Sequence, residues 1–290
     1  MSGLSFVTLA AYDHARLLQS IAAYYAIADE IVVGLDEEGL SWSLQPLKLD
    51  GAELEARLKA ADPRGILRVV RGPFHAHPRP MDNELEERRF LSRLCREGNW
   101  VVQIDADELL LKPLDFRDHL LKQRPGVQVM ARWLTVYKAL PGKLLLVKGP
   151  SDWAPLASLS RDRYRHGRET GEPRSYSPFW LLHNSWGYTE EEVRFKLRNW
   201  GHALEVDAAG FLDQWKRMDA DNFKACRNLS PVNPPSWPRL ELLDLGQQSL
   251  EDYALALPAA WSLRTQWALW RFRLGRKARS LKKRWGAPWA

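Results

Sequence analysis

The sequence predicts an α/β fold in which a mostly parallel sheet is covered by helices. Segments with strand and helix patterns alternate through the first half of the chain, and one very apolar strand runs directly into a group of acidic residues. A length of 290 residues, with 45% hydrophobic and 27% charged residues, suits one large domain with an appendage. This composition excludes a disordered chain.

The first elements predict a βαβ unit. Residues 5–11 have the pattern of a strand, and Asp13 is placed to cap the helix that follows. Residues 30–35 have the pattern of a second strand, which ends at Asp36. The helix between them should bury one face, formed by Leu17, Leu18, Ile21, Ala22 and Tyr25.

The same alternation continues toward the acidic group. We expect a helix at 52–61, a strand at 66–70, a charged helix at 83–97 that Gly98 stops, and a buried strand at 100–104. The acids follow that last strand, so they should project from the carboxyl end of the sheet, where open α/β sheets bind ligands.

The second half predicts fewer regular elements. Strands at 127–137 and 144–148 would form a hairpin around Gly142, and residues 149–178 predict a long functional loop before a short strand at 179–183.

A helix beginning after Thr189 and a stiff connector complete this part of the chain. Thr189 and Glu192 form a capping-box pattern, and the proline-rich residues 231–238 predict the connector. The buried face of the helix is predicted to hold Val193, Leu197, Trp200 and Leu204.

The C-terminal segment differs in charge from the rest of the chain. Residues 261–290 hold nine basic and no acidic residues, so subtracting nine from the net charge of +6 leaves residues 1–260 at −3. Apolar residues recur there at steps of three and four: Leu263, Trp267, Trp270, Leu274, Ala278, Leu281 and Trp285. We therefore expect a domain at 1–245 and a basic amphipathic helical extension at 246–290.

An anionic membrane surface is the partner that such a helix favours. The alternative is a terminal helix docked on the domain with its basic face in water. Nucleic acid is not expected as a partner, because no nucleic-acid-binding motif accompanies the charge. No apolar run is long enough to span a bilayer and no secretory signal pattern opens the chain, so we expect a cytoplasmic protein at the inner face of the membrane. The separated Cys95 and Cys226 predict reduced thiols.

Asp105, Asp107 and Glu108 are the most informative group of residues. Three carboxylates crowded after one strand repel one another and need a cation. Carboxylate oxygens suit Mg²⁺ or Mn²⁺, and such a metal commonly holds a nucleotide by its phosphates. A solvated acidic turn after a strand is the alternative, because Asp-x-Asp alone also occurs by chance.

Three segments resemble the GT-A glycosyltransferases, in particular family-2-like bacterial enzymes of lipopolysaccharide core and capsule assembly. The first is the βαβ unit ending at Asp36. The second is Glu84-Leu-Glu-Glu-Arg-Arg-Phe with the following Gln-Ile-Asp-Ala-Asp-Glu. The third is Leu181-Leu-His-Asn-Ser-Trp-Gly-Tyr-Thr-Glu-Glu-Glu followed by Lys196 and Arg198-Asn199-Trp200. Such enzymes have a Rossmann-like nucleotide-diphospho-sugar transferase fold.

The resemblance implies roles for individual residues. Asp107 would bind the metal, with Asp105 beside it near the metal or the donor ribose. His183 would complete the metal or diphosphate site. Asp36 would contact the donor base, and Arg89 would orient the acids or face the diphosphate; turn capping and a helix-surface ion pair are the respective alternatives.

The reaction also requires a base for the acceptor hydroxyl. Four acids lie in the expected interval, and Glu172 is a slight favourite: Asp152, Asp162, Glu169 and Glu172. Aromatic rings can stack on sugars, and four tryptophans flank the predicted cleft, although core packing is the commoner role: Trp133, Trp153, Trp180 and Trp186.

These observations predict a metal-dependent glycosyltransferase that uses Mn²⁺ or Mg²⁺. It would move a sugar from a nucleoside-diphosphate donor to a cell-envelope glycan or lipid-linked acceptor. Two alternatives stay open: a nucleotidyltransferase or other nucleotide-sugar enzyme, and a non-catalytic carbohydrate-binding or membrane-scaffold protein with the same fold.

Overall fold

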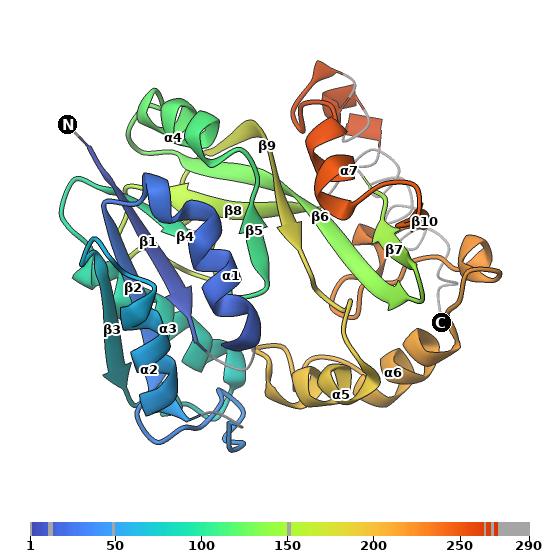
Figure 1. The fold of residues 1–290 in the computed structure, drawn as a ribbon, viewed down its shortest axis with the longest axis horizontal. Coiled ribbons are helices and arrows are strands. Elements are labelled where there is room, and N and C mark those ends of the chain that lie inside the picture. The colour runs from blue at the N-terminus through green and yellow to red at the C-terminus, as the bar shows by residue number, and fades with distance from the viewer. Residues whose placement is uncertain are drawn as a thin grey trace, which may run out of the picture.

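A mixed sheet runs through the computed structural model of this chain, and helices cover it (Figure 1). The structure describes residues 2–10, 14–47, 50–149, 152–263, 265–267 and 270–271. Asp13, predicted to cap the first helix, lies outside the described residues, as does most of the predicted C-terminal helix.

The strands are β1 (Leu4–Leu9), β2 (Glu30–Asp36), β3 (Leu67–Gly72), β4 (Trp100–Gln103), β5 (Glu108–Leu110), β6 (Gln128–Leu140), β7 (Lys143–Val147), β8 (Trp153–Ser158), β9 (Arg174–His183) and β10 (Leu240–Asp244). The helices are α1 (His14–Tyr24), α2 (Gly51–Ala60), α3 (Pro80–Leu94), α4 (Pro113–Leu121), α5 (Glu190–Asn199), α6 (Ala208–Arg217) and α7 (Leu250–Ala256). Three short 3₁₀ turns, Tyr25–Ile27, Phe223–Ala225 and Pro234–Ser236, complete the set within the described residues.

The predicted α/β class is confirmed, with a central parallel sheet in the N-terminal half. The strand order is β10-β7-β6-β8-β4-β1-β2-β3, and the pairs β4–β1, β1–β2 and β2–β3 are parallel. The other half of the sheet is mixed, because β9 runs parallel to β6 while β8, β7 and β10 pair antiparallel with their neighbours.

Successive residues of β1 point to opposite faces of the sheet and join different cores. Leu4 and Phe6 pack in the core that includes side chains of α1, α2 and α4. Val7 and Leu9 pack in the core that includes Leu91 of α3. Helices on both faces bury the parallel strands, as such strands require.

Several sequence predictions need correction. Residues 149–178 are not one loop, because β8 and the first half of β9 lie there. Leu204 is 73% exposed, since α5 ends at Asn199. Residues 231–238 are not a simple connector: Trp237 is buried in a core cluster, and β10 follows to pair with β7.

The predicted extension at 246–290 begins with residues that pack against the rest of the structure. Ala254 of α7 is buried, and Ala260 donates its N–H to the carbonyl of Pro178. The predicted domain boundary at residue 245 stays a prediction. Among the described residues, no helix is both long and apolar enough to cross a membrane.

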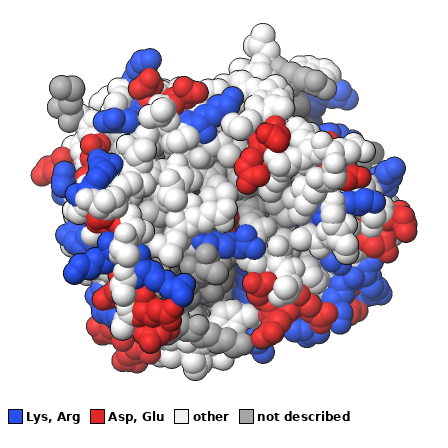
Figure 2. Space-filling model, viewed as in Figure 1, with Lys and Arg blue, Asp and Glu red and all other residues white. Residues whose placement is uncertain are grey.

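On the face drawn in Figure 2, uncharged surface covers much of the middle, with Lys or Arg atoms also visible near the centre. Lys and Arg alternate with Asp and Glu around the rim of this face. Acidic and basic groups are therefore intermixed on the part of the surface that this view shows.

Candidate active site

Three acidic side chains gather where β4 ends. Asp105 and Asp107 follow β4, and Glu108 opens β5, which pairs antiparallel with β9 so that Glu108 lies opposite His183. Asn184 donates its N–H to the carbonyl of Asp107 at 2.9 Å, which fixes the acidic turn to the end of β9. The sequence prediction that the acids leave the carboxyl end of a buried strand is therefore confirmed.

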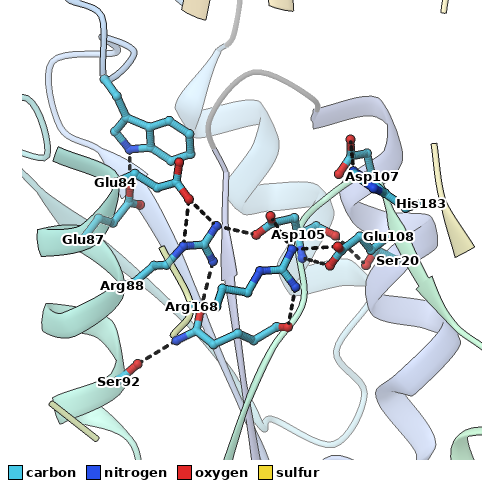
Figure 3. Close-up of polar contacts among 12 residues, drawn as sticks. Ser20, Glu84, Glu87, Arg88, Ser92, Asp105, Asp107, Glu108, Arg168 and His183 are labelled. Carbon is cyan, nitrogen blue, oxygen red and sulfur yellow. Dashed lines mark hydrogen bonds and ion pairs between the residues drawn. The ribbon is translucent and has the colours of Figure 1, made fainter. Parts of the chain in front are cut away.

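Two arginines hold Asp105 between them (Figure 3). Arg88 of α3 donates to Asp105 Oδ1 at 2.8 Å and to Glu84 Oε1 at 2.8 Å. Arg168 donates to Asp105 Oδ2 at 2.8 Å and to Glu108 Oε1 at 2.6 Å. Burial alone would raise the pKa of Asp105, but Arg168 and Arg88 together hold it well below its usual range.

Glu108 is the most enclosed acid of the group. Its side chain is fully buried, and beside Arg168 it accepts hydrogen bonds from Trp133 Nε1 at 2.7 Å and from the N–H of Asp105 at 2.9 Å. The carboxylate thus organises the turn that carries Asp105, a role in architecture rather than in ligand contact.

The loop that carries Arg168 is fastened by one glutamine. The side-chain amide of Gln128 donates to the carbonyl of Arg168 at 2.6 Å and accepts from the N–H of Thr170 at 3.2 Å. Gly167 allows the turn with a φ of +50°. These contacts hold the guanidinium of Arg168 beside Asp105 and Glu108.

Asp107 is paired with a lysine and faces a histidine. Its Oδ2 accepts from Lys196 Nζ at 2.8 Å and lies 3.7 Å from His183 Nε2. Burial alone would raise the pKa of Asp107, but Lys196, aided by His183, holds it below its ordinary value. Burial lowers the pKa of His183, so its imidazole is neutral near pH 7.

The cluster keeps a negative charge despite its three cations. Four carboxylates, those of Glu84, Asp105, Asp107 and Glu108, face Arg88, Arg168 and Lys196, which leaves −1 when His183 is neutral. The negative charge expected from the sequence is therefore only partly compensated by the protein's own side chains.

A cavity of about 480 Å³ opens over this cluster. The charged groups that line it include Asp105, Asp107, Arg168, His183 and Lys196. Its aromatic wall consists of Trp42, Trp133, Trp153, Trp186, Trp200 and Trp237. This combination of a polar floor and apolar rings suits a ligand with both charged and sugar-like parts.

The metal implied by the resemblance fits two of the three predicted ligands. Both oxygens of Asp105 are bound to guanidinium groups, so the structure does not present Asp105 as a metal ligand. Asp107 and the neutral imidazole of His183 remain, and His183 Nδ1 is buried without a hydrogen-bond partner among the described residues. Within that part of the chain, no three His, Cys, Asp or Glu side chains are grouped as a metal site. A pair of protein ligands is nevertheless enough where substrate phosphates supply the rest.

Asp36 and Arg89 are placed away from the cavity lining. Asp36 accepts hydrogen bonds from the N–H groups of Glu38, Leu40 and Phe74 and contacts His75, so its carboxylate closes a turn. The predicted contact of Asp36 with a donor base stays a prediction.

Arg89 likewise does not reach the acids. It donates to the carbonyl of Tyr164 at 2.8 and 2.6 Å, whereas its neighbour Arg88 contacts Asp105. Adjacent residues on a helix point about 100° apart, so only one of the two arginines can face β4. The helix predicted at 83–97 lies at Pro80–Leu94, and its Arg88 rather than Arg89 reaches Asp105; a role of Arg89 toward the diphosphate stays a prediction.

Glu172 is also absent from the cavity lining. It accepts hydrogen bonds from the hydroxyl groups of Ser158 and Thr170, and its assignment as the base stays a prediction. Of the other candidates, Glu169 lines the cavity, while Asp152 is buried and bound to Thr135 and Trp237. Asp162 is exposed and is not among the lining residues.

Three of the four predicted tryptophans reach the cavity. Trp133, Trp153 and Trp186 line it, whereas Trp180 donates to the carbonyl of Pro258 at 2.8 Å.

The sequence reasoning missed the roles of Arg88 and Arg168. A signal for Arg88 was present, because Met81, Arg88 and Leu91 share the buried face of α3 at helical spacing. Arg168 had no local signal, since 63 residues separate it from Asp105.

No family model and no curated protein matches this chain. Similar solved structures include glucosyl-3-phosphoglycerate synthase from Mycobacterium tuberculosis in complex with Mn²⁺, uridine diphosphate and phosphoglyceric acid, with 19% identity and a TM-score of 0.29 over 46% of this chain and 43% of that chain. A nucleotidyl transferase from Methanothermobacter has 14% identity and a TM-score of 0.33 over 76% of this chain and 100% of that chain. The match spans less than half the length of the synthase.

Proposed function

We propose that this chain is a metal-dependent glycosyltransferase that moves a sugar from a nucleoside-diphosphate donor to a cell-envelope glycan or lipid-linked acceptor. The observation that carries the proposal is the pair of Asp107 and neutral His183 in a cavity walled by tryptophans. The resemblance of these residues to the Asp-x-Asp and Leu-Leu-His segments of GT-A enzymes agrees with that geometry.

Asp107 and His183 would hold the divalent cation. When bound, Mn²⁺ or Mg²⁺ would supply a Lewis acid for the departing diphosphate. The charge of the cluster supports this role: a site at −1 repels a diphosphate, and a divalent cation changes its charge to +1.

The protein's own residues have complementary tasks in this proposal. Arg88 and Arg168 lock Asp105, which fixes the turn and keeps Asp107 aimed at His183. Glu169 is the proposed base for the acceptor hydroxyl, because it is the one of the four acids predicted for this role that lines the cavity. The indole rings would pack on sugar faces and exclude water.

We also propose that the C-terminal segment binds an anionic membrane surface. Leu263, Trp267 and Trp270 are 83%, 58% and 59% exposed, and the sequence around them is basic. Trp261, in contrast, stacks on Tyr176 with ring centroids 4.4 Å apart. The start of the segment is therefore fixed to β9, while its apolar side chains are available to lipid.

The function is tested by a screen of nucleoside-diphosphate sugars in Mn²⁺, with release of the nucleoside diphosphate as the readout. Asp107→Asn should abolish release and weaken nucleotide binding only when the metal is present, because it removes a charged ligand and keeps the shape. His183→Ala should lower release at least tenfold with a melting temperature within a few degrees of the wild type.

Asp213→Asn is the matched control. Asp213 lies on α6 with its side chain 67% exposed, in an ion pair with Arg217, so the same change there should leave release unchanged. If the wild-type protein bound no nucleoside diphosphate with Mn²⁺ by calorimetry, the enzyme proposal would fail and a non-catalytic role would stand.

A further inference from the structure

Lys196 places a buried ammonium group at the cavity. It lies on α5 with its side chain 5% exposed, and its Nζ contacts Asp107 Oδ2 and the carbonyl of Ser185, each at 2.8 Å. The rings of Trp186 and Tyr188 lie 5.1 and 5.3 Å from the same nitrogen. A charge this deeply enclosed requires a permanent anionic or polar environment.

The partners of Lys196 differ from those of the two arginines. Arg88 bridges Glu84 and Asp105, and Arg168 bridges Asp105 and Glu108, so each guanidinium is held between two carboxylates. Lys196 instead pairs with Asp107, the carboxylate that also faces His183. The two arginines are built into the wall, whereas the lysine shares its partner with the proposed metal site.

A divalent cation and Lys196 would draw on the same carboxylate. Asp107 Oδ2 lies 2.8 Å from Lys196 Nζ and 3.7 Å from His183 Nε2. A metal bound by Asp107 would repel the ammonium and take most of the carboxylate's charge. The cavity that Lys196 lines would admit a second anion, which would then contact the ammonium in place of Asp107.

We propose that Lys196 binds the diphosphate of the donor, exchanging the Asp107 carboxylate for phosphate oxygens when the divalent cation binds. This inference rests on the proposed function. An ammonium is a compact point charge that suits phosphate oxygens, and its position beside the metal site would let it hold charge that develops on the leaving diphosphate.

The support of Lys196 fits such an exchange. The start of α5 is fixed by a complete capping box between Thr189 and Glu192, so the helix backbone need not move. The lysine side chain ends in freely rotating single bonds, and its ammonium can turn from the carboxylate toward the cavity while Ser185 and the aromatic rings still surround it.

Calorimetry on the full chain tests the exchange with two probes that do not depend on the donor base. Mn²⁺ alone reports on Asp107 and His183, and pyrophosphate with Mg²⁺ reports on the diphosphate site. Lys196→Met should bind Mn²⁺ at least as tightly as the wild type, because a competing cation is gone. It should bind pyrophosphate at least tenfold more weakly. A purely structural role would instead weaken both.

Lys138→Met is the matched control. Lys138 is another buried lysine, 8% exposed, whose ammonium donates to the carbonyls of Trp215, Lys216 and Met218 and does not line the cavity. Its loss should leave both affinities unchanged. If Lys196→Met does not fold, Lys196→Gln, which keeps a polar group but no charge, takes its place.

The outcomes separate this inference from the proposed function. Pyrophosphate binding within twofold of the wild type in the Lys196 variant, while the wild type binds it with Mg²⁺, would overturn the role of Lys196 and leave the function standing. A wild-type protein that binds neither pyrophosphate nor a nucleoside diphosphate in the presence of metal would overturn both.

Discussion

Replacing Arg168 by Met should destabilise the protein through charge rather than packing. The guanidinium lies 2.8 Å from Asp105 and 2.6 Å from Glu108, and Glu108 is fully buried. Methionine fills much of the same space but leaves both carboxylates without their shared cation. Removing one partner of a buried ion pair costs about 3–5 kcal/mol, and for a chain of this size that lowers the melting temperature by roughly 5–8 °C.

The loss should depend on pH in a defined direction. Arg168 and Arg88 hold the pKa of Asp105 below its ordinary value, so this pair contributes stability above about pH 4 that disappears as the pH falls through the folded-state value. The difference between wild type and Arg168→Met should therefore persist from pH 7 down to about pH 4 and shrink below it, so it should be larger at pH 7 than at about pH 2. Urea unfolding followed by tryptophan fluorescence at the two pH values measures it.

Arg217→Met is the control for this prediction. Arg217 forms an ion pair with Asp213 at 2.7 Å, but the two side chains are 77% and 67% exposed, so its removal should cost less than about 1 kcal/mol. An Arg168 variant that loses no more than this control at pH 7 would refute the view that the guanidinium neutralises the acidic turn.

Two further predictions concern other parts of the molecule. Burial raises the pKa of Glu87 to about 8, which exceeds its ordinary value, so the melting temperature of the wild type should fall as the pH rises from about 4.5 to 8. Glu87→Gln can still accept a hydrogen bond from Trp42 Nε1, and its melting temperature should lack this dependence on pH. The same fall of melting temperature with pH in both proteins would contradict the prediction. Ending the chain after Ser262, which keeps the packed Trp261, should abolish flotation with anionic vesicles and preserve Mn²⁺-dependent nucleotide binding; equal flotation of both forms would exclude the membrane role.

Local patterns predicted the elements that local physics determines. The parallel strands near the N-terminus, the hairpin at Gly142 and the capping box at Thr189 each follow from periodicity or turn chemistry within a few residues. The sequence did not predict strand β8, because Pro155 breaks the sequence pattern of a strand there. The proline is accommodated where the pairing with β6 shifts register between Val129 and Met130, an irregularity that no local pattern announces.

Leu204 shows how a helical period can mislead. The spacing from Val193 onward continued past the true end of α5, but Gly201 follows the cap residue, and a side chain there would meet the carboxylate of Glu84 on α3. Leu204 lies beyond this end of the helix and is exposed. Glycine just after a helix is a common local stop signal, and the apolar spacing was extended past it.

The charge of the candidate site could be predicted from the sequence only in part. The crowded carboxylates after β4 predicted that positive charge lies beside them. The sequence could not show whether a metal ion or the protein's own side chains supply that charge. The three acids have different partners in the structure. Asp105 contacts Arg88 of α3 and Arg168 of the loop before β9, and Glu108 contacts Arg168. Asp107 contacts Lys196 and faces the neutral His183. Glu84, Asp105 and Glu108 share two guanidinium groups and so carry the net −1 of the cluster, whereas Asp107 is matched by Lys196. Because guanidinium groups occupy both oxygens of Asp105 while Asp107 faces His183, a divalent cation should bind at Asp107, and changes at Asp105 should act on stability before they act on metal affinity.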